Sequence, residues 1–166
     1  TVNSVPVQPG TISRNATICS GALNTFGVAS VSGATSYAWT LPNGWTGTST
    51  TSSIGATPNA TSGDVTVTAN NSCGSSDVQS LTVTVNSTPV QPGTIGGNAT
   101  ICSGTLNTYS IASVNNATSY TWTLPGGWTG TLMTNVIEAT ASATSGDVSV
   151  TANNTCGSSA PRILAV

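Results

Sequence analysis

Short runs of alternating apolar and polar residues fill the chain, and clusters of Pro, Gly, Asn and Ser separate them. Alternation with a period of two is typical of strands that bury one face. In the first half of the chain it predicts strands at residues 10–18, 24–31, 36–41, 64–70 and 78–85, with two weaker strands near 45–49 and 52–57. About seven short strands at this spacing indicate an all-β, immunoglobulin-like sandwich.

The abundance of Thr and Val supports this fold class, because β-branched side chains pack well in sheets and the usual helix formers are scarce here. The inward positions of the predicted strands give a small core. Its predicted members in the first half are Ile12, Phe26, Val28, Tyr37, Trp39, Leu41, Ile54, Val65, Val67, Ala69, Leu81 and Val83.

The second half repeats the first at a constant offset of 83 residues, and 58 of the 83 aligned positions are identical. The repeat predicts two tandem sandwich domains, 1–85 and 86–166, joined by a linker at 86–92 whose prolines favour an extended path. Residues 1–4 match 84–87, and Val166 matches Val83. We therefore expect residues 1–4 to be the tail of a preceding repeat or a linker, and both ends to be cuts through a longer array.

Two segments of each repeat carry a family resemblance. In the first repeat they are Ser36-Tyr37-Ala38-Trp39-Thr40-Leu41-Pro42-Asn43-Gly44-Trp45 and Val65-Thr66-Val67-Thr68-Ala69-Asn70-Asn71-Ser72-Cys73-Gly74. They resemble the PKD-like, immunoglobulin-like tandem repeats of large Bacteroidetes cell-surface proteins, including gliding-motility adhesins. The resemblance implies a secreted, extracellular protein in which such domains are spacers or adhesive modules. The chain departs from standard PKD domains at Pro42-Asn43-Gly44, where those domains have a Gly-Asp-Gly turn.

Charged side chains are nearly absent, with two Arg, four Asp or Glu, no Lys, no His and a net charge of −2. So sparse a charge provides no electrostatic footprint for nucleic acid or for an anionic membrane. No apolar stretch approaches the roughly 20 residues of a membrane-spanning helix, so we expect no membrane insertion. A serine nucleophile would also lack its usual bases.

The carboxylates give no sign of catalysis or metal binding. Asp64 and Asp147 hold the same position in successive domains, so they do not form the close pair that a glycosidase needs. We interpret Asp64 as a turn residue at the start of a strand rather than as a calcium ligand, because calcium sites gather several oxygens. The sequence therefore predicts no enzyme, no metal site and no cofactor.

The four tryptophans are the best candidates for contact with a ligand, since a flat exposed indole can stack on a sugar. Trp39 and Trp122 lie in mid-strand, where core packing is expected, whereas Trp45 and Trp128 follow a turn. Two hypotheses follow. The chain is a passive spacer whose partners are neighbouring repeats of the same array, or it is an adhesive module that binds an extracellular polysaccharide or surface through exposed Trp45 and Trp128.

Four cysteines in a secreted chain suggest disulfides: Cys19, Cys73, Cys102 and Cys156. The simplest pairing lies within each domain, Cys19 with Cys73 and Cys102 with Cys156. Cys19, however, precedes the second predicted strand and Cys73 follows the penultimate one, and these strands run the same way in a sandwich. The two cysteines then lie at opposite poles, farther apart than the roughly 7 Å that a disulfide allows between Cα atoms. We prefer a bridge between Cys19 and Cys156, which leaves Cys73 and Cys102 for neighbouring copies, and the intradomain pairing remains the alternative.

Overall fold

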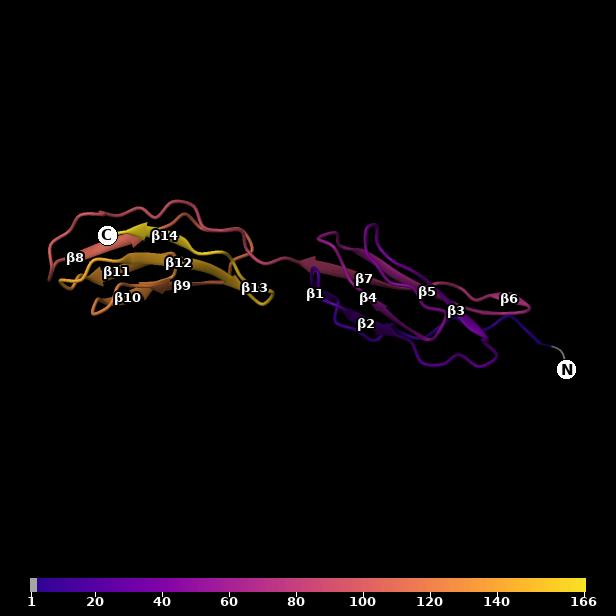
Figure 1. Cartoon of the computed structure of the whole chain (residues 1–166). Helices are drawn as coiled ribbons and strands as arrows, with labels where there is room; N and C mark the ends of the chain where they lie inside the picture. The colour runs from indigo at the N-terminus through magenta and orange to yellow at the C-terminus, as the bar shows by residue number, and fades with distance from the viewer. Residues whose placement is uncertain (1–2) are drawn as a thin grey trace. The chain divides into compact units, whose positions relative to one another are not determined.

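The computed structural model describes residues 3–166, and every regular element among them is a β-strand (Figure 1). The chain divides into two compact units, Thr1–Ser87 and Thr88–Val166. The expectation that Thr1 and Val2 end a strand of a preceding copy lies outside the described residues. Within the described part, no helix is long and apolar enough to cross a membrane.

The first unit is a sandwich of two sheets. One sheet has the strand order β1-β7-β5-β3, with β6 on the end of β5, and the other is the β2-β4 pair. These strands are β1 (Thr17–Cys19), β2 (Asn24–Gly27), β3 (Ser36–Thr40), β4 (Ser53–Ala56), β5 (Gly63–Asn71), β6 (Gly74–Ser75) and β7 (Gln79–Asn86). The predicted all-β, immunoglobulin-like sandwich is confirmed.

The second unit repeats this plan with two differences. Its sheets have the orders β10-β11-β8 and β13-β12-β14, and β9 pairs with β12. The strands are β8 (Leu106–Ser110), β9 (Ser119–Thr123), β10 (Thr129–Met133), β11 (Val136–Thr140), β12 (Asp147–Asn154), β13 (Gly157–Ser158) and β14 (Arg162–Ala165). Strand β10 is formed here, whereas its counterpart in the first unit makes only an isolated bridge, and the described residues include no counterpart of β1.

Alternation along the long strands builds the core of each unit. In β5, Val65 and Val67 are at most 1% exposed, while Thr66 between them is half-buried. These valines face Phe26 and Ile54, which pair with each other across β2 and β4. Most of the residues predicted to form the core are thus confirmed as buried, but those at the edge of the core are not. Three predicted core residues are only half-buried: Trp39, Leu41 and Leu81.

The predicted first strand, at residues 10–18, is wrong in its extent. Ser13 bridges to Gly27 of β2, whereas the following β1 pairs in parallel with β7 in the opposite sheet. The segment therefore changes sheets midway, so it cannot form one continuous ladder. Cys19 lies opposite Asn86 in this parallel pairing.

Residues 88–92, most of the predicted linker, pack on the second unit. Pro89 and Pro92 are buried, and the side chain of Gln91 donates to the carbonyl of Pro161 at 2.7 Å. Arg162 Nε donates to the carbonyl of Pro92 at 3.0 Å. These contacts give the segment a fixed path along its own domain.

Candidate functional site

Trp45 ends a tight turn and points into the core of the first unit. Its backbone N–H donates to Pro42 O at 3.1 Å, and Gly44 takes a φ of 79°, which glycine adopts without strain. The indole is 8% exposed, its ring centroid lies 6.1 Å from that of Phe26, and Nε1 donates to Thr61 O at 2.8 Å. Trp45 therefore presents no open ring to a sugar, and the adhesive hypothesis loses this residue as a contact.

Trp39 departs from its predicted burial in the core. It lies on β3, the edge strand of its sheet, so one side of the strand has no neighbouring strand to cover it. The indole is half-buried and its Nε1 donates to Thr51 O at 2.9 Å. In the second unit, Trp122 makes the equivalent bond to Thr134 O at 3.4 Å.

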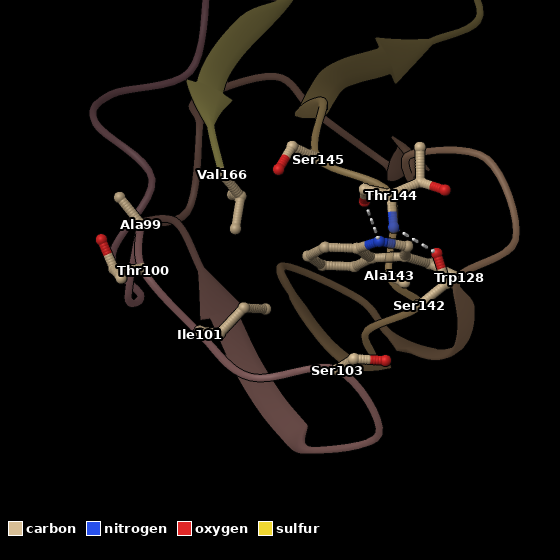
Figure 2. Close-up of a pocket in the computed structure, with 10 residues that line it drawn as sticks. All are labelled: Ala99, Thr100, Ile101, Ser103, Trp128, Ser142, Ala143, Thr144, Ser145 and Val166. Carbon is tan, nitrogen blue, oxygen red and sulfur yellow. Dashed lines mark hydrogen bonds between the residues drawn. The ribbon is translucent and has the colours of Figure 1, made fainter.

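Trp128 lies on the wall of a groove in the second unit (Figure 2). Its ring centroid is 6.4 Å from that of Tyr109, and Nε1 donates to Thr144 O at 2.9 Å, so its orientation matches that of Trp45. Unlike Trp45, it is half-buried. The groove has a volume of about 490 Å³, and the side chains of Ile101 and Val166 border it beside the indole.

Two of the four cysteines are oxidised and two are free thiols. Cys19 and Cys156 are disulfide-bonded, whereas Cys73 and Cys102 are free and exposed. The intradomain alternative, which requires Cys73 and Cys102 in bridges, is therefore wrong. The strand register explains why. Cys19 lies opposite the end of β7, next to the start of β5, whereas Cys73 follows the far end of that nine-residue strand, roughly 30 Å away.

Cys73 and Cys156 are presented by the same turn. The backbone N–H of each cysteine donates to the side chain of the asparagine two residues earlier, Asn71 or Asn154, at 2.8 Å. The glycine that follows each cysteine has a positive φ, 142° in one turn and 135° in the other. The Asn-Asn-x-Cys-Gly segment thus folds as a side-chain-stabilised turn that holds the cysteine at the tip of a hairpin.

Asp64 has a structural partner. Its carboxylate accepts a hydrogen bond from the hydroxyl of Thr82 at 2.7 Å, across the β5–β7 pair. Among the described residues, no three His, Cys, Asp or Glu side chains gather closely enough to hold a metal ion. The pKa of the Tyr109 phenol is raised by burial.

The groove beside Trp128 was missed by reasoning from the sequence. Its polar lining comes from Ala99, Ser103 and Ser145, which carry no catalytic or binding motif. No motif in the sequence points to it, because its lining comes from segments that lie far apart along the chain.

Comparison with known proteins supports the architecture. A family model described as PKD-like domain matches residues 5–83 and again 88–166. No curated protein sequence matches the chain.

Among solved structures, the N-terminal eight Ig domains of Down Syndrome Cell Adhesion Molecule isoform 1.30.30 align with a TM-score of 0.64 and 17% identity. That alignment covers 98% of this chain and 27% of the other. Titin domains A168–A170 align with a TM-score of 0.52 and 16% identity, over 94% of this chain and 58% of theirs. The chain thus spans only part of either protein, and at such identities the likeness concerns the fold.

Proposed function

The chain belongs to the PKD-like domain family, with one member in each half, and from this premise we propose that it is a non-catalytic spacer repeat of a secreted cell-surface adhesin. The observation that carries the proposal is the burial of Trp45. Trp45 was the best candidate for ligand contact in the first repeat, and its indole is instead buried against Phe26. Within this proposal, the resemblance of the paired-tryptophan segments favours an adhesin of the gliding-motility type.

Internal bonds repeated in both units also support a spacer. Tyr37 and Tyr120 each accept a hydrogen bond from a valine backbone N–H six residues earlier, at 2.7 and 2.8 Å. Each turn tryptophan donates its Nε1 to a threonine carbonyl. Duplicating such bonds preserves a domain's shape, which is what a spacer requires of each copy.

The oxidised cysteines support an extracellular location, because disulfides persist in oxidising compartments. We propose that Cys19 and Cys156 are bonded to each other. The chain has four cysteines and the other two are free, so no other pairing remains within one molecule. Such a bond links the two repeats covalently, and its role in a spacer would be to stiffen the joint.

A second candidate function, binding of an extracellular polysaccharide, is favoured by one observation. Trp128 is half-buried and lies on the wall of a groove. A glycan array probed with the disulfide-bonded protein separates the two functions. A spacer gives no specific signal, whereas binding that Trp128→Ala abolishes and Trp122→Ala retains would replace the spacer with an adhesive module.

A further inference from the structure

Strand β10 forms one edge of its sheet in the second unit, and all five of its residues are exposed (Figure 1). In the described part of the chain it pairs with β11 alone, so no strand covers its other side. Proteins usually protect such an edge with Lys, Pro or a bulge, because an open edge readily pairs with another strand. The sequence Thr-Gly-Thr-Leu-Met has none of these, and it pairs with β11 residue for residue.

The first unit has no such strand at the corresponding position. Ser49 and Thr50 stand there in place of Leu132 and Met133. Ser49 Oγ donates to the carbonyl of Ser53 at 2.6 Å, and local bonds of this kind compete with a strand ladder. In the second unit Leu132 and Met133 are instead 52% and 50% exposed on a formed strand.

The hairpin between β10 and β11 determines which backbone groups of β10 face outward. Its loop has two residues, so Met133 and Val136 form the hydrogen-bonded pair that closes it. Hydrogen-bonded and non-hydrogen-bonded pairs alternate along an antiparallel ladder. Thr131 therefore bonds to β11, whereas the N–H and C=O groups of Gly130 and Leu132 point to the open side.

An apolar groove of about 370 Å³ lies beside this strand. Trp122, Leu124 and Ile137 line it together with Gly130 and Leu132. A Cβ added at Gly130 would lie 2.8 Å from Leu124 Cδ1 and 3.2 Å from Ile137 Cδ1, so this face of the glycine turns toward the groove. The groove thus offers apolar contacts to a side chain that is brought alongside Gly130.

We propose that two copies of this chain pair through β10, antiparallel and about a twofold axis at Thr131. In this register Thr131 lies opposite its own counterpart, and Gly130 lies opposite Leu132 of the second copy. Each such pair exchanges two backbone hydrogen bonds through the outward-pointing groups. Opposite residues of a ladder share one face of the sheet, so each copy's Leu132 enters the other copy's groove beside Gly130.

The sequence of β10 favours a second copy as the occupant. A strand that fits must place an apolar side chain opposite Gly130 and a small residue opposite Leu132, and β10 read backwards about Thr131 does both. Charge does not oppose the pairing, because β10 has no charged residue and Glu138 is the one charged residue opposite it in β11. The two Glu138 side chains would lie three strand spacings apart, roughly 14 Å, which exceeds the Debye length at physiological ionic strength.

The contact is small, so we expect the association to be weak. Two five-residue strands bury on the order of a few hundred Å², below the roughly 1,200 Å² of a stable interface. Copies held side by side on a surface would overcome this through their high effective concentration. Such pairing adds lateral association to the proposed spacer function and does not depend on it.

A cysteine placed on the twofold axis tests the register. Cys73→Ser and Cys102→Ser first remove the two free thiols and leave the oxidised cysteines in place. In that background, Thr131→Cys places the Cα atoms of the two new cysteines about 4.5 Å apart, which a disulfide can span. Thr129→Cys is the matched control, because its two copies would lie roughly 14 Å apart along the paired strands. With oxidised glutathione as the oxidant, Thr131→Cys should form a covalent dimer roughly tenfold faster than Thr129→Cys, and equal rates would overturn the proposal.

The apolar contact is tested in the same background. Leu132→Asp should slow the linkage of Thr131→Cys roughly tenfold, whereas Leu106→Asp, at an exposed position in β8, should leave the rate unchanged. Sedimentation equilibrium at concentrations up to roughly 1 mM should show a dimer that Leu132→Asp abolishes and Leu106→Asp retains. Protein that stays monomeric there, with both cysteine variants linking equally slowly, would leave the edge to a strand of another protein and exclude self-pairing. The proposed function would then still stand, because a spacer need not associate sideways.

Discussion

Tyr109 occupies in the second unit the position that Phe26 holds in the first, and its additional hydroxyl donates to the carbonyl of Asn98 at 3.3 Å. The second copy makes room for it through Gly97, where an added Cβ would collide with the tyrosine ring. The first copy carries Arg14 at the corresponding position, beside the smaller phenylalanine. The two copies thus accommodate different aromatic rings by paired changes.

The buried phenol should make the second unit sensitive to alkali. Burial raises the pKa of Tyr109 above its ordinary value of 10.0, so the folded state holds the proton where the unfolded state releases it. The free energy of unfolding should be unaffected below about pH 10 and should fall as the pH rises above it. Urea midpoints between pH 8 and 11.5 measure this. Tyr109→Phe should flatten the decline, and superimposable curves for the two proteins would contradict the assignment.

Trp45→Ala should destabilise the first unit far more than Trp39→Ala. Truncation of a buried Trp costs about 3–5 kcal/mol, whereas a half-buried side chain at a sheet edge should cost less, about 1–2 kcal/mol. Urea unfolding followed by circular dichroism gives both values. Equal losses would mean that edge and core positions are energetically equivalent here.

Asn71→Ala should destabilise the first unit by about 1–3 kcal/mol. Its side chain donates to the carbonyls of Ser4 and Gly33 and accepts from the N–H of Cys73, so one truncation removes three bonds. The neighbouring Asn70 is the matched control, because its buried Oδ1 has no partner in the described structure. Asn70→Ala should be neutral or stabilising in the same unfolding assay, and a greater loss there than at Asn71 would refute this account of the turn.

Alkylation of the native, unreduced protein should modify Cys73 and Cys102 and spare the other two cysteines. Proteolysis under non-reducing conditions should then yield one linked peptide that joins Cys19 to Cys156. Mass spectrometry identifies both products. A linked peptide that joins Cys19 to Cys73 would exclude the bridge between the repeats.

Alternation and repetition made most of the fold predictable from the sequence. The strand at residues 64–70 alternates Val with Thr, and the structure buries Val65 and Val67 as that pattern requires. The opposite poles of Cys19 and Cys73 also followed from strand order, because direction reverses at every turn.

The burial of side chains at the edge of the core could not be predicted in the same way. Trp39 has apolar neighbours in mid-strand, but its exposure depends on β3 being an edge strand, which is a property of sheet order. Trp45 follows a turn, yet the turn aims its ring at Phe26. The groove beside Trp128 is lined by segments far apart in the sequence, and alternation within one segment carries no information about its neighbours in space.

The parallel pairing of β1 and β7 determines how the first unit resists a pulling force. Once the disulfide at Cys19 is reduced, tension that enters ahead of Thr17 leaves beyond Asn86, so it draws the two parallel strands past one another along their length. The hydrogen bonds between them lie across that direction and must share the load, unlike those of a hairpin, which peel apart one after another. The hydrogen bonds between β1 and β7 must therefore break together before the domain can extend.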